Sequence, residues 1–192
     1  MATETIRLNI TLPSALAKEL KRISAPRKQS QFVAEAVEQR IKQLKKKQME
    51  KILAEGYKAT NKEGLEITKE FESVDSRVGM NIRRGDIYLT ALDPVVGSEI
   101  AKTRPVIVVS NNINNMYAGT VTVLPITSKK PKKTYPFELP LPKGTGNLKK
   151  DSKAKADQIR TLDKTRLVKY IGKLKNEHLD LLNEAIKIHL AL

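Results

Sequence analysis

Two side chains that can act on a phosphate group, Arg104 and Thr127, lie at the borders of predicted core strands. Arg104 directly precedes the apolar run 105–109, whose Val and Ile content is typical of a strand buried on both faces. Thr127 directly follows the next predicted strand, 120–126. The planar guanidinium of arginine matches phosphate oxygens, and a threonine hydroxyl adds another donor. Because rigid strand ends would hold both groups, the pair can bind a phosphodiester and stabilise the charge that develops during its cleavage.

If the phosphodiester belongs to RNA, a metal is not required, because RNA carries its own nucleophile, the 2′-hydroxyl. The enzyme then has to hold that oxygen in line with the scissile bond and stabilise the crowded phosphorane. Arginine is a poor general base, so we assign Arg104 to charge stabilisation and proton donation, and Thr127 to holding the phosphate. The sequence has no Cys and only two His. We therefore expect neither a metal site nor a cofactor.

The surrounding residues leave a structural alternative open, in which Arg104 pairs with Glu99 or Asp93 and Thr127 only ends a strand. In the functional interpretation, Glu99 orders a loop over the site, and the proline-bracketed, lysine-rich segment after Thr127 is an irregular RNA-binding loop. A second lysine-rich loop, 143–155, is expected to line the same channel. The residues expected to bind RNA are Glu99, Ser128, Lys129, Lys130, Lys132 and Lys133.

The charge balance favours a polyanionic partner. The 192 residues carry 36 Lys and Arg against 21 Asp and Glu, a formal net charge of +15, which indicates nucleic acid or a solubilising lysine surface. The charge is uneven, because residues 80–192 have a net charge of +10 and residues 50–75 a net charge of −3. No apolar run reaches the roughly 20 residues that a membrane-spanning helix needs. With no secretory signal pattern either, we expect a cytoplasmic protein without membrane contact.

The second half of the chain predicts an α+β domain. Strands are expected at 86–92, 105–109, 120–126, 137–141 and 157–162, with a polar turn at 111–115. A final helix is expected from Asn176 to Leu190, because Leu179, Leu182, Ile186 and Leu190 recur at helical spacing.

Four sequence blocks in residues 80–192 resemble the MazF/PemK/Kid toxin family: RRGDIYLTALDPVVGSE, KTRPVIVVSN, LPITS and ADQIRTLDKTRL. They occur in the family's order and spacing, with Met80 as the expected native start of the toxin. The resemblance implies an SH3-like β-barrel with a C-terminal helix, a homodimer or higher oligomer, and metal-independent, sequence-specific cleavage of single-stranded RNA. It also implies that Arg104 and Thr127 are the catalytic residues.

Residues 1–48 predict a strand followed by two helices. Residues 5–12 alternate between apolar and polar side chains, Pro13 permits a helix over 15–23, and Ser30 is a good N-cap for a second helix. This unit is too small to enclose a core, so a second chain is expected. It resembles the ribbon-helix-helix DNA-binding family, whose paired strands enter the major groove. The residues expected to contact operator DNA are Thr5, Arg7, Asn9 and Ser30, the alternative being the solvated face of an ordinary edge strand.

Residues 49–79 predict an antitoxin tail and linker. Gly56 is expected to end or weaken the second helix, and apolar residues are too sparse from 57 to 78 to build a core. An acidic segment with spaced apolar anchors can cover a basic nucleic-acid groove, whereas the simpler interpretation is a plain linker. The anchors expected to neutralise the toxin, in the same chain or in a neighbouring one, are Leu65, Ile67 and Phe71.

The sequence therefore predicts a fused toxin and antitoxin, an RNase that its own or a neighbouring tail keeps inactive. The fusion can be natural or engineered. A competing hypothesis is a non-enzymatic DNA-binding regulator whose barrel binds protein partners such as gyrase. The presence of both Arg104 and Thr127 favours the enzyme.

Overall fold

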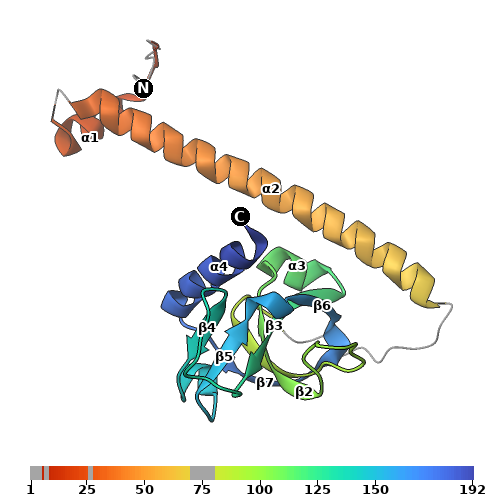
Figure 1. The fold of residues 1–192 in the computed structure, drawn as a ribbon. Coiled ribbons are helices and arrows are strands. Elements are labelled where there is room, and N and C mark those ends of the chain that lie inside the picture. The colour runs from red at the N-terminus through yellow and green to blue at the C-terminus, as the bar shows by residue number, and fades with distance from the viewer. Residues whose placement is uncertain (1–5, 7–8, 26–27, 70–80) are drawn as a thin grey trace. The chain divides into compact units, whose positions relative to one another are not determined.

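The computed structural model in Figure 1 describes residues 6, 9–25, 28–69 and 81–192, and for residues 62–69 it describes the backbone alone. The chain divides into two compact units, Met1–Glu50 and Lys51–Leu192. Every strand among the described residues belongs to the second unit, and the described elements of the first unit are helical.

The strands of the second unit form one antiparallel sheet of seven strands. Along the sheet the order is β4-β5-β3-β2-β1-β7, and β6 pairs with β3 off this path. The strands are β1 (Asp86–Ala91), β2 (Thr103–Val108), β3 (Thr120–Thr127), β4 (Glu138–Leu141), β5 (Ser152–Lys155), β6 (Arg160–Asp163) and β7 (Leu167–Lys173). Strand β3 pairs with three other strands. Its earlier residues pair with β6 and β2, and its last two residues pair with β5.

Alternation of side chains along β2 and β3 builds two apolar clusters, one on each face of the strands. Ile107, Leu124 and Ile126 belong to one cluster, which helix α4 (Asn176–Leu190) joins through the fully buried Leu182. Val106 and Val108 of β2 and Val121 and Val123 of β3 belong to the other cluster, and all four side chains are fully buried. The ends of β2 and β3 are therefore held in place from both sides.

The predicted α+β architecture is confirmed for this unit as an antiparallel sheet with a C-terminal helix. β1 to β4 lie within two residues of their predicted bounds, and α4 spans the predicted residues. Two strands that the sequence did not predict, β5 and β7, complete the sheet. β5 lies at the end of the segment 143–155, which the sequence predicts as a lysine-rich loop. The strand was missed because lysines without an alternation of apolar residues give no strand signal.

Two short predicted elements differ from the structure. The predicted turn at 111–115 holds helix α3 (Asn112–Tyr117), because the Asn111 side chain accepts a hydrogen bond from the Asn114 N–H at 2.8 Å and caps it. The predicted strand at 157–162 begins late, because a 3₁₀ turn at Ala156–Gln158 precedes β6.

The predicted strand at 5–12 is not formed in its described part. Residues 6 and 9–13 lie outside helix and strand, and the structure does not describe the other residues of that range. In a ribbon-helix-helix protein the partner of this strand belongs to a second chain, and an unpaired strand is not stable alone. The two predicted helices are present as α1 (Ser14–Ile23) and α2 (Gln29–Lys69), so Ser30 lies in the first turn of α2 instead of capping it.

Helix α2 is longer than the sequence predicts, because it continues through Gly56 to Lys69. A glycine inside a helix costs about 1 kcal/mol relative to alanine, and the Lys, Glu, Ala and Gln residues on both sides outweigh that cost. The first part of the predicted irregular tail is therefore helical. None of the helices in the described part of the chain is long and apolar enough to cross a membrane.

The apolar stripe of the first unit has no core to cover. Of the residues whose side chains the structure describes before position 62, none is buried. Apolar side chains that are 43–65% exposed include Leu16, Ile23, Phe32, Val37, Ile41 and Leu44. Such a stripe is typical of a unit that completes its core with a partner.

The buried carboxyl group of Asp86, at the start of β1, makes the stability of the sheet depend on pH. Burial raises the pKa of Asp86, while the Arg83 N–H, which donates to Oδ2 at 2.8 Å, and the charges of Lys173 and Arg83 act in the opposite direction. Because this folded pKa lies above its unfolded value, the contribution of Asp86 to stability is lost as pH rises through the folded pKa.

Asp86→Asn keeps an acceptor for the Arg83 N–H and cannot ionise. We expect the free energy of unfolding of the parent, relative to that of Asp86→Asn, to fall as pH rises from about 4, the ordinary value of an aspartate, towards neutrality. Urea unfolding of both proteins at several pH values measures this difference, in which all other titrating groups cancel. A difference that stays constant or increases with pH would contradict the assignment.

Candidate active site

Arg104 and Thr127 lie at adjoining strand ends on one face of the sheet. Arg104 is the second residue of β2 and shares its strand face with Val106 and Val108, and Thr127 is the last residue of β3 and shares its face with Val121 and Val123. Both side chains are half-buried, which leaves part of each open to solvent.

The register of the two strands places the pair at the same end of the ladder. β2 and β3 are antiparallel, with Val108 opposite Val123 and Val106 opposite Pro125. Two residues further, the same register brings Arg104 opposite Thr127. The paired residues of β2 and β3 end at Val106 and Pro125, before this point, whereas on its other edge β3 continues to pair with β5, with Thr127 opposite Lys153. The space between the two strand ends is thus bordered by a guanidinium on one side and a hydroxyl on the other.

The guanidinium of Arg104 is oriented by the backbone. Its Nε–H donates to the carbonyl oxygen of Ala101 at 2.8 Å, which leaves the N–H groups of the two terminal nitrogens available to a ligand. Within the described residues Arg104 forms no ion pair with a carboxylate. The alternative in which Arg104 pairs with Asp93 or Glu99 is not observed, because Asp93 accepts from the Lys102 N–H and Glu99 pairs with Arg160.

The hydroxyl of Thr127 is oriented by the segment that follows it. Its oxygen accepts a hydrogen bond from the Lys129 N–H at 3.1 Å. The hydroxyl proton is therefore free to be donated outwards. Arg104 and Thr127 thus both present donors, the arrangement that an anionic phosphate requires.

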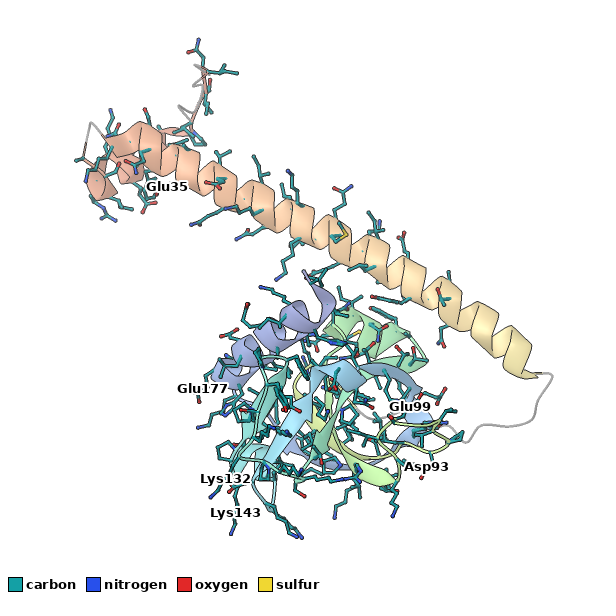
Figure 2. The ribbon with its side chains drawn as sticks, viewed as in Figure 1. Glu35, Asp93, Glu99, Lys132, Lys143 and Glu177 are labelled. Carbon is teal, nitrogen blue, oxygen red and sulfur yellow. The ribbon has the colours of Figure 1, made fainter. Side chains whose placement is uncertain are left out.

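The loop between β1 and β2 carries Glu99, which was expected to order this loop. Figure 2 labels Glu99 and Asp93 in the loop. Oε2 of Glu99 lies 3.7 Å from the guanidinium of Arg160, and the neighbouring Ile100 N–H donates to Oε1 of Gln158 at 3.1 Å. The Asp93 carboxylate closes the base of the loop on the Lys102 N–H. Both contacts with residues 158–160 attach this loop to the start of β6.

Residues 128–136, here called the basic segment, follow Thr127 directly and contain no helix or strand. Its five predicted RNA-binding residues are exposed: Ser128, Lys129, Lys130, Lys132 and Lys133. Figure 2 labels Lys132 in this segment. A turn closed by the Lys133 N–H on the Lys130 carbonyl shapes its middle. Four exposed lysines therefore concentrate positive charge in the segment that directly follows Thr127.

A buried ion pair lies next to the basic segment, and sequence reasoning missed it. Lys153 Nζ lies 2.9 Å from Oε2 of Glu138, and the side chains are 8% and 2% exposed. The one available signal was Glu138 inside the apolar run FELPL, where a carboxylate needs a partner.

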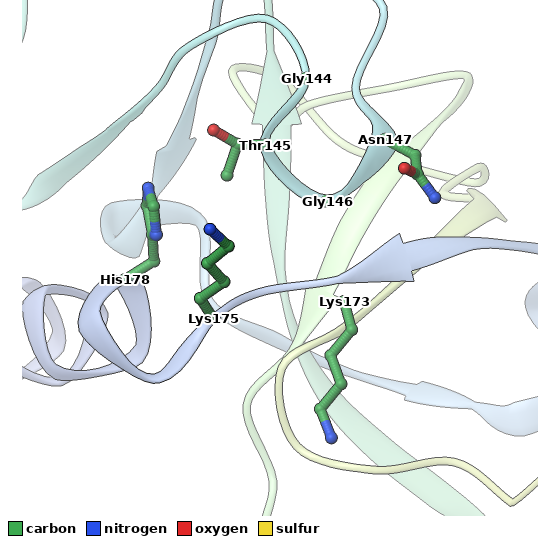
Figure 3. A pocket seen from close by; sticks show the side chains of 7 residues that line it. All are labelled: Gly144, Thr145, Gly146, Asn147, Lys173, Lys175 and His178. Atoms are coloured by element: carbon green, nitrogen blue, oxygen red, sulfur yellow. The ribbon is translucent and has the colours of Figure 1, made fainter.

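The described surface also has a hollow away from Arg104. A cavity of about 390 Å³ is lined by Gly144, Thr145, Gly146, Asn147, Lys173, Lys175 and His178 (Figure 3). Lys173 pairs with Asp86 at one end of β1, whereas Arg104 pairs with Thr90 near the other. At about 3.3 Å per residue these two register positions are roughly 13 Å apart along β1. The tip of the second lysine-rich loop therefore lies at the end of β1 distant from Arg104.

The predicted residues of the first half are placed only in part. Thr5, Arg7 and Phe71 lie outside the described residues, and for Leu65 and Ile67 the backbone alone is described, as part of α2. Asn9 and Ser30 are exposed. Among the described residues no group of three or more His, Cys, Asp or Glu side chains could hold a metal ion.

Comparison with known proteins identifies the second unit. The family described as the PemK-like, MazF-like toxin of type II toxin-antitoxin systems matches residues 83–190. Endoribonuclease MazF9 of Mycobacterium tuberculosis is 43% identical over 116 residues, which cover 58% of this chain and 98% of the relative. Endoribonuclease EndoA of Bacillus subtilis is 40% identical over 113 residues, 59% of this chain and 97% of the relative.

A solved structure agrees with this assignment. The crystal structure of MazF from Deinococcus radiodurans is 25% identical, covers 59% of this chain and 99% of its own, and superposes with a TM-score of 0.52. The antiparallel sheet and its C-terminal helix thus define a toxin-type domain. The chain belongs to the PemK-like, MazF-like toxin family.

Proposed function

We propose that residues 81–192 form an endoribonuclease that cleaves single-stranded RNA without a metal ion, through Arg104 and Thr127. The observation that carries the proposal is the pair of outward donors at adjoining strand ends beside the basic segment. The relatives that are 40–43% identical carry the name endoribonuclease, which supports the same reaction class.

In this mechanism the 2′-oxygen attacks the adjacent phosphorus, and the bond from phosphorus to the 5′-oxygen breaks. The products are a 2′,3′-cyclic phosphate and a 5′-hydroxyl. The 2′ proton passes to solvent, and the leaving 5′-oxygen takes a proton from Arg104 or from water. The terminal nitrogens of Arg104 bind the non-bridging oxygens as negative charge accumulates on them, and the Thr127 hydroxyl donates to the same group.

Substrate selection follows from the same surface. The exposed lysines of the basic segment attract the RNA backbone, and single-stranded RNA can bend into the space between two strand ends. In this proposal Glu99, whose loop is attached to residues 158–160, contacts bases next to the scissile phosphate. The identity of those bases then sets the sequence specificity.

We further propose that the first half of the chain regulates this activity as an antitoxin. Its exposed apolar stripe supports assembly with a second copy, in which residues 5–12 of two chains pair as a ribbon and present Arg7 and Asn9 to operator DNA. Residues 65–75 then cover the RNA-binding surface of its own or a neighbouring toxin domain. The net charge of −3 over residues 50–75 complements the +10 of residues 80–192.

The catalytic prediction uses one substitution at each of the two proposed catalytic residues in residues 81–192, the region that matches nearly the whole length of the relatives. Thr127→Val and Arg104→Lys are each expected to lower kcat by about 10²–10³-fold, because Thr127→Val removes a donor to the developing charge and Arg104→Lys removes the planar fork that binds two phosphate oxygens at once. Cleavage of single-stranded RNA in EDTA, with end-group analysis of the products, measures this. Thr120→Val, at the exposed start of β3, is the matched control and should cleave like the parent.

Inhibition by EDTA, or full activity of both variants, would refute the mechanism. A folded parent that leaves RNA intact would instead favour a protein-binding regulator.

The neutralisation prediction compares the full chain with residues 81–192. We expect the full chain to be the weaker nuclease, because covalent linkage or dimerisation raises the local tail concentration to roughly millimolar. Leu65→Asp combined with Phe71→Asp should restore cleavage, whereas Lys62→Asp should not, since it introduces the same charge without removing an anchor. If the double variant is as inactive as the parent while residues 81–192 are active, the tail is only a linker.

The DNA prediction concerns Arg7. In the full chain, Arg7→Ala should relax base preference at one position of a selected duplex at a cost of about 1–3 kcal/mol, whereas Lys45→Gln should weaken binding evenly across sequences. Gel shifts on the selected site and on its single-base variants measure both effects. Identical preference in Arg7→Ala and the parent would remove Arg7 from the interface.

A further inference from the structure

Lys153 is a lysine whose side chain is buried in the sheet of the second unit. It lies on β5 between β3 and β4, directly opposite Thr127 in one register and Pro140 in the other. Its side chain is 8% exposed. A lysine ammonium in such a place is costly unless it is paired and fully hydrogen-bonded.

The ammonium group of Lys153 has two acceptors, and one belongs to the basic segment. Nζ lies 2.9 Å from Oε2 of Glu138 and donates to the carbonyl oxygen of Lys133 at 2.6 Å. It also lies 6.0 Å from the centre of the Tyr135 ring. The buried charge is thus used to hold the backbone of an exposed loop.

Glu138 also holds the basic segment, through contacts with Tyr135. Its Oε2 accepts from the Tyr135 N–H at 3.1 Å, and the Tyr135 carbonyl accepts from the Glu138 N–H at 2.8 Å. The Tyr135 ring stacks on Phe137 with ring centres 5.6 Å apart. Together with the Lys129 N–H on Thr127, these contacts attach the basic segment at both of its ends.

We propose that the Lys153–Glu138 pair is a positioning device, which holds the backbone of the basic segment so that its lysines meet the RNA strand at Thr127. This inference rests on the proposed RNA cleavage. The two residues touch no substrate. They act through the Lys133 carbonyl and the Tyr135 N–H, and their removal frees the middle of the segment while the ladder between Thr127 and Lys153, which is made by backbone groups, persists.

Lys155 provides the matched comparison. It also faces Glu138, at 3.6 Å, and Asp157 at 3.1 Å, but it makes no recorded contact with the basic segment. Lys155→Met therefore removes the same charge from the same carboxylate and leaves the segment attached. An effect that comes only from the lost charge, or from Glu138 losing a lysine partner, is expected in both Lys153→Met and Lys155→Met. Release of the basic segment is expected only in Lys153→Met.

The attachment is tested first without reference to activity. Limited trypsin digestion of the full chain should cut after the lysines of the basic segment several-fold faster in Lys153→Met than in Lys155→Met. Because Lys153→Met leaves the buried carboxylate of Glu138 with only the more distant ammonium of Lys155, at 3.6 Å, the double variant Lys153→Met with Glu138→Gln is measured beside it. The double variant lacks both buried charges of the Lys153–Glu138 pair. The amide oxygen introduced by Glu138→Gln can still accept the hydrogen bond from the Tyr135 N–H. Equal digestion of both Lys153 variants and Lys155→Met would overturn the proposal.

The functional consequence is tested on RNA cleavage by residues 81–192. The double variant is expected to raise KM about tenfold with kcat within about twofold of the parent, because ordering of a binding segment acts on ground state and transition state alike. Lys153→Arg, which can reach the same acceptors, should restore most of the affinity.

The outcomes separate the two proposals. If the parent does not cleave RNA, the proposed function fails, and the digestion experiment still decides whether Lys153 holds the segment. If the parent cleaves and the double variant matches Lys155→Met in KM, the pair stabilises the fold only and the positioning role is wrong. A change confined to kcat would equally overturn it.

Discussion

The site depends on the double pairing of β3. Its first residues pair with β6 and β2, and its last two, beyond the residues paired with β2, pair with β5. Where β2 and β3 separate, the sheet has two adjoining strand ends with half-buried polar side chains. The alternation along both strands places Arg104 and Thr127 on one face, and the buried valines beneath hold them there. The register between β2 and β3 therefore determines how Arg104 and Thr127 lie relative to each other.

Much of this arrangement could be predicted from the sequence. The Val- and Ile-rich run after Arg104 and the strand ending at Thr127 were located within two residues, because buried strands give a strong local signal. Strands β5 and β7 were missed, because lysines on β5 and exposed residues on β7 hide any alternation. The Lys153–Glu138 pair could not be predicted, since it joins two strands whose register the sequence does not reveal.

The first half of the chain was harder to predict from the sequence. Its helices were predicted, but the expected strand is absent from the described residues, and α2 runs past the glycine that was expected to weaken it. Local helix propensity decides the length of α2, whereas a strand needs a partner that one chain does not contain. A ribbon-helix-helix assembly is a property of two chains, so it remains a proposal for this protein.

The hydrogen bond from the Lys129 N–H occupies one of the two lone pairs of the Thr127 oxygen and leaves the hydroxyl proton to be donated. Arg104 offers donors alone, because a guanidinium has no acceptor and stays charged throughout the physiological range. Neither a neutral hydroxyl nor a guanidinium is a base that can take the proton of a ribose. In the proposed mechanism that proton therefore passes to solvent, and the pair contributes charge stabilisation and a fixed place for the phosphate.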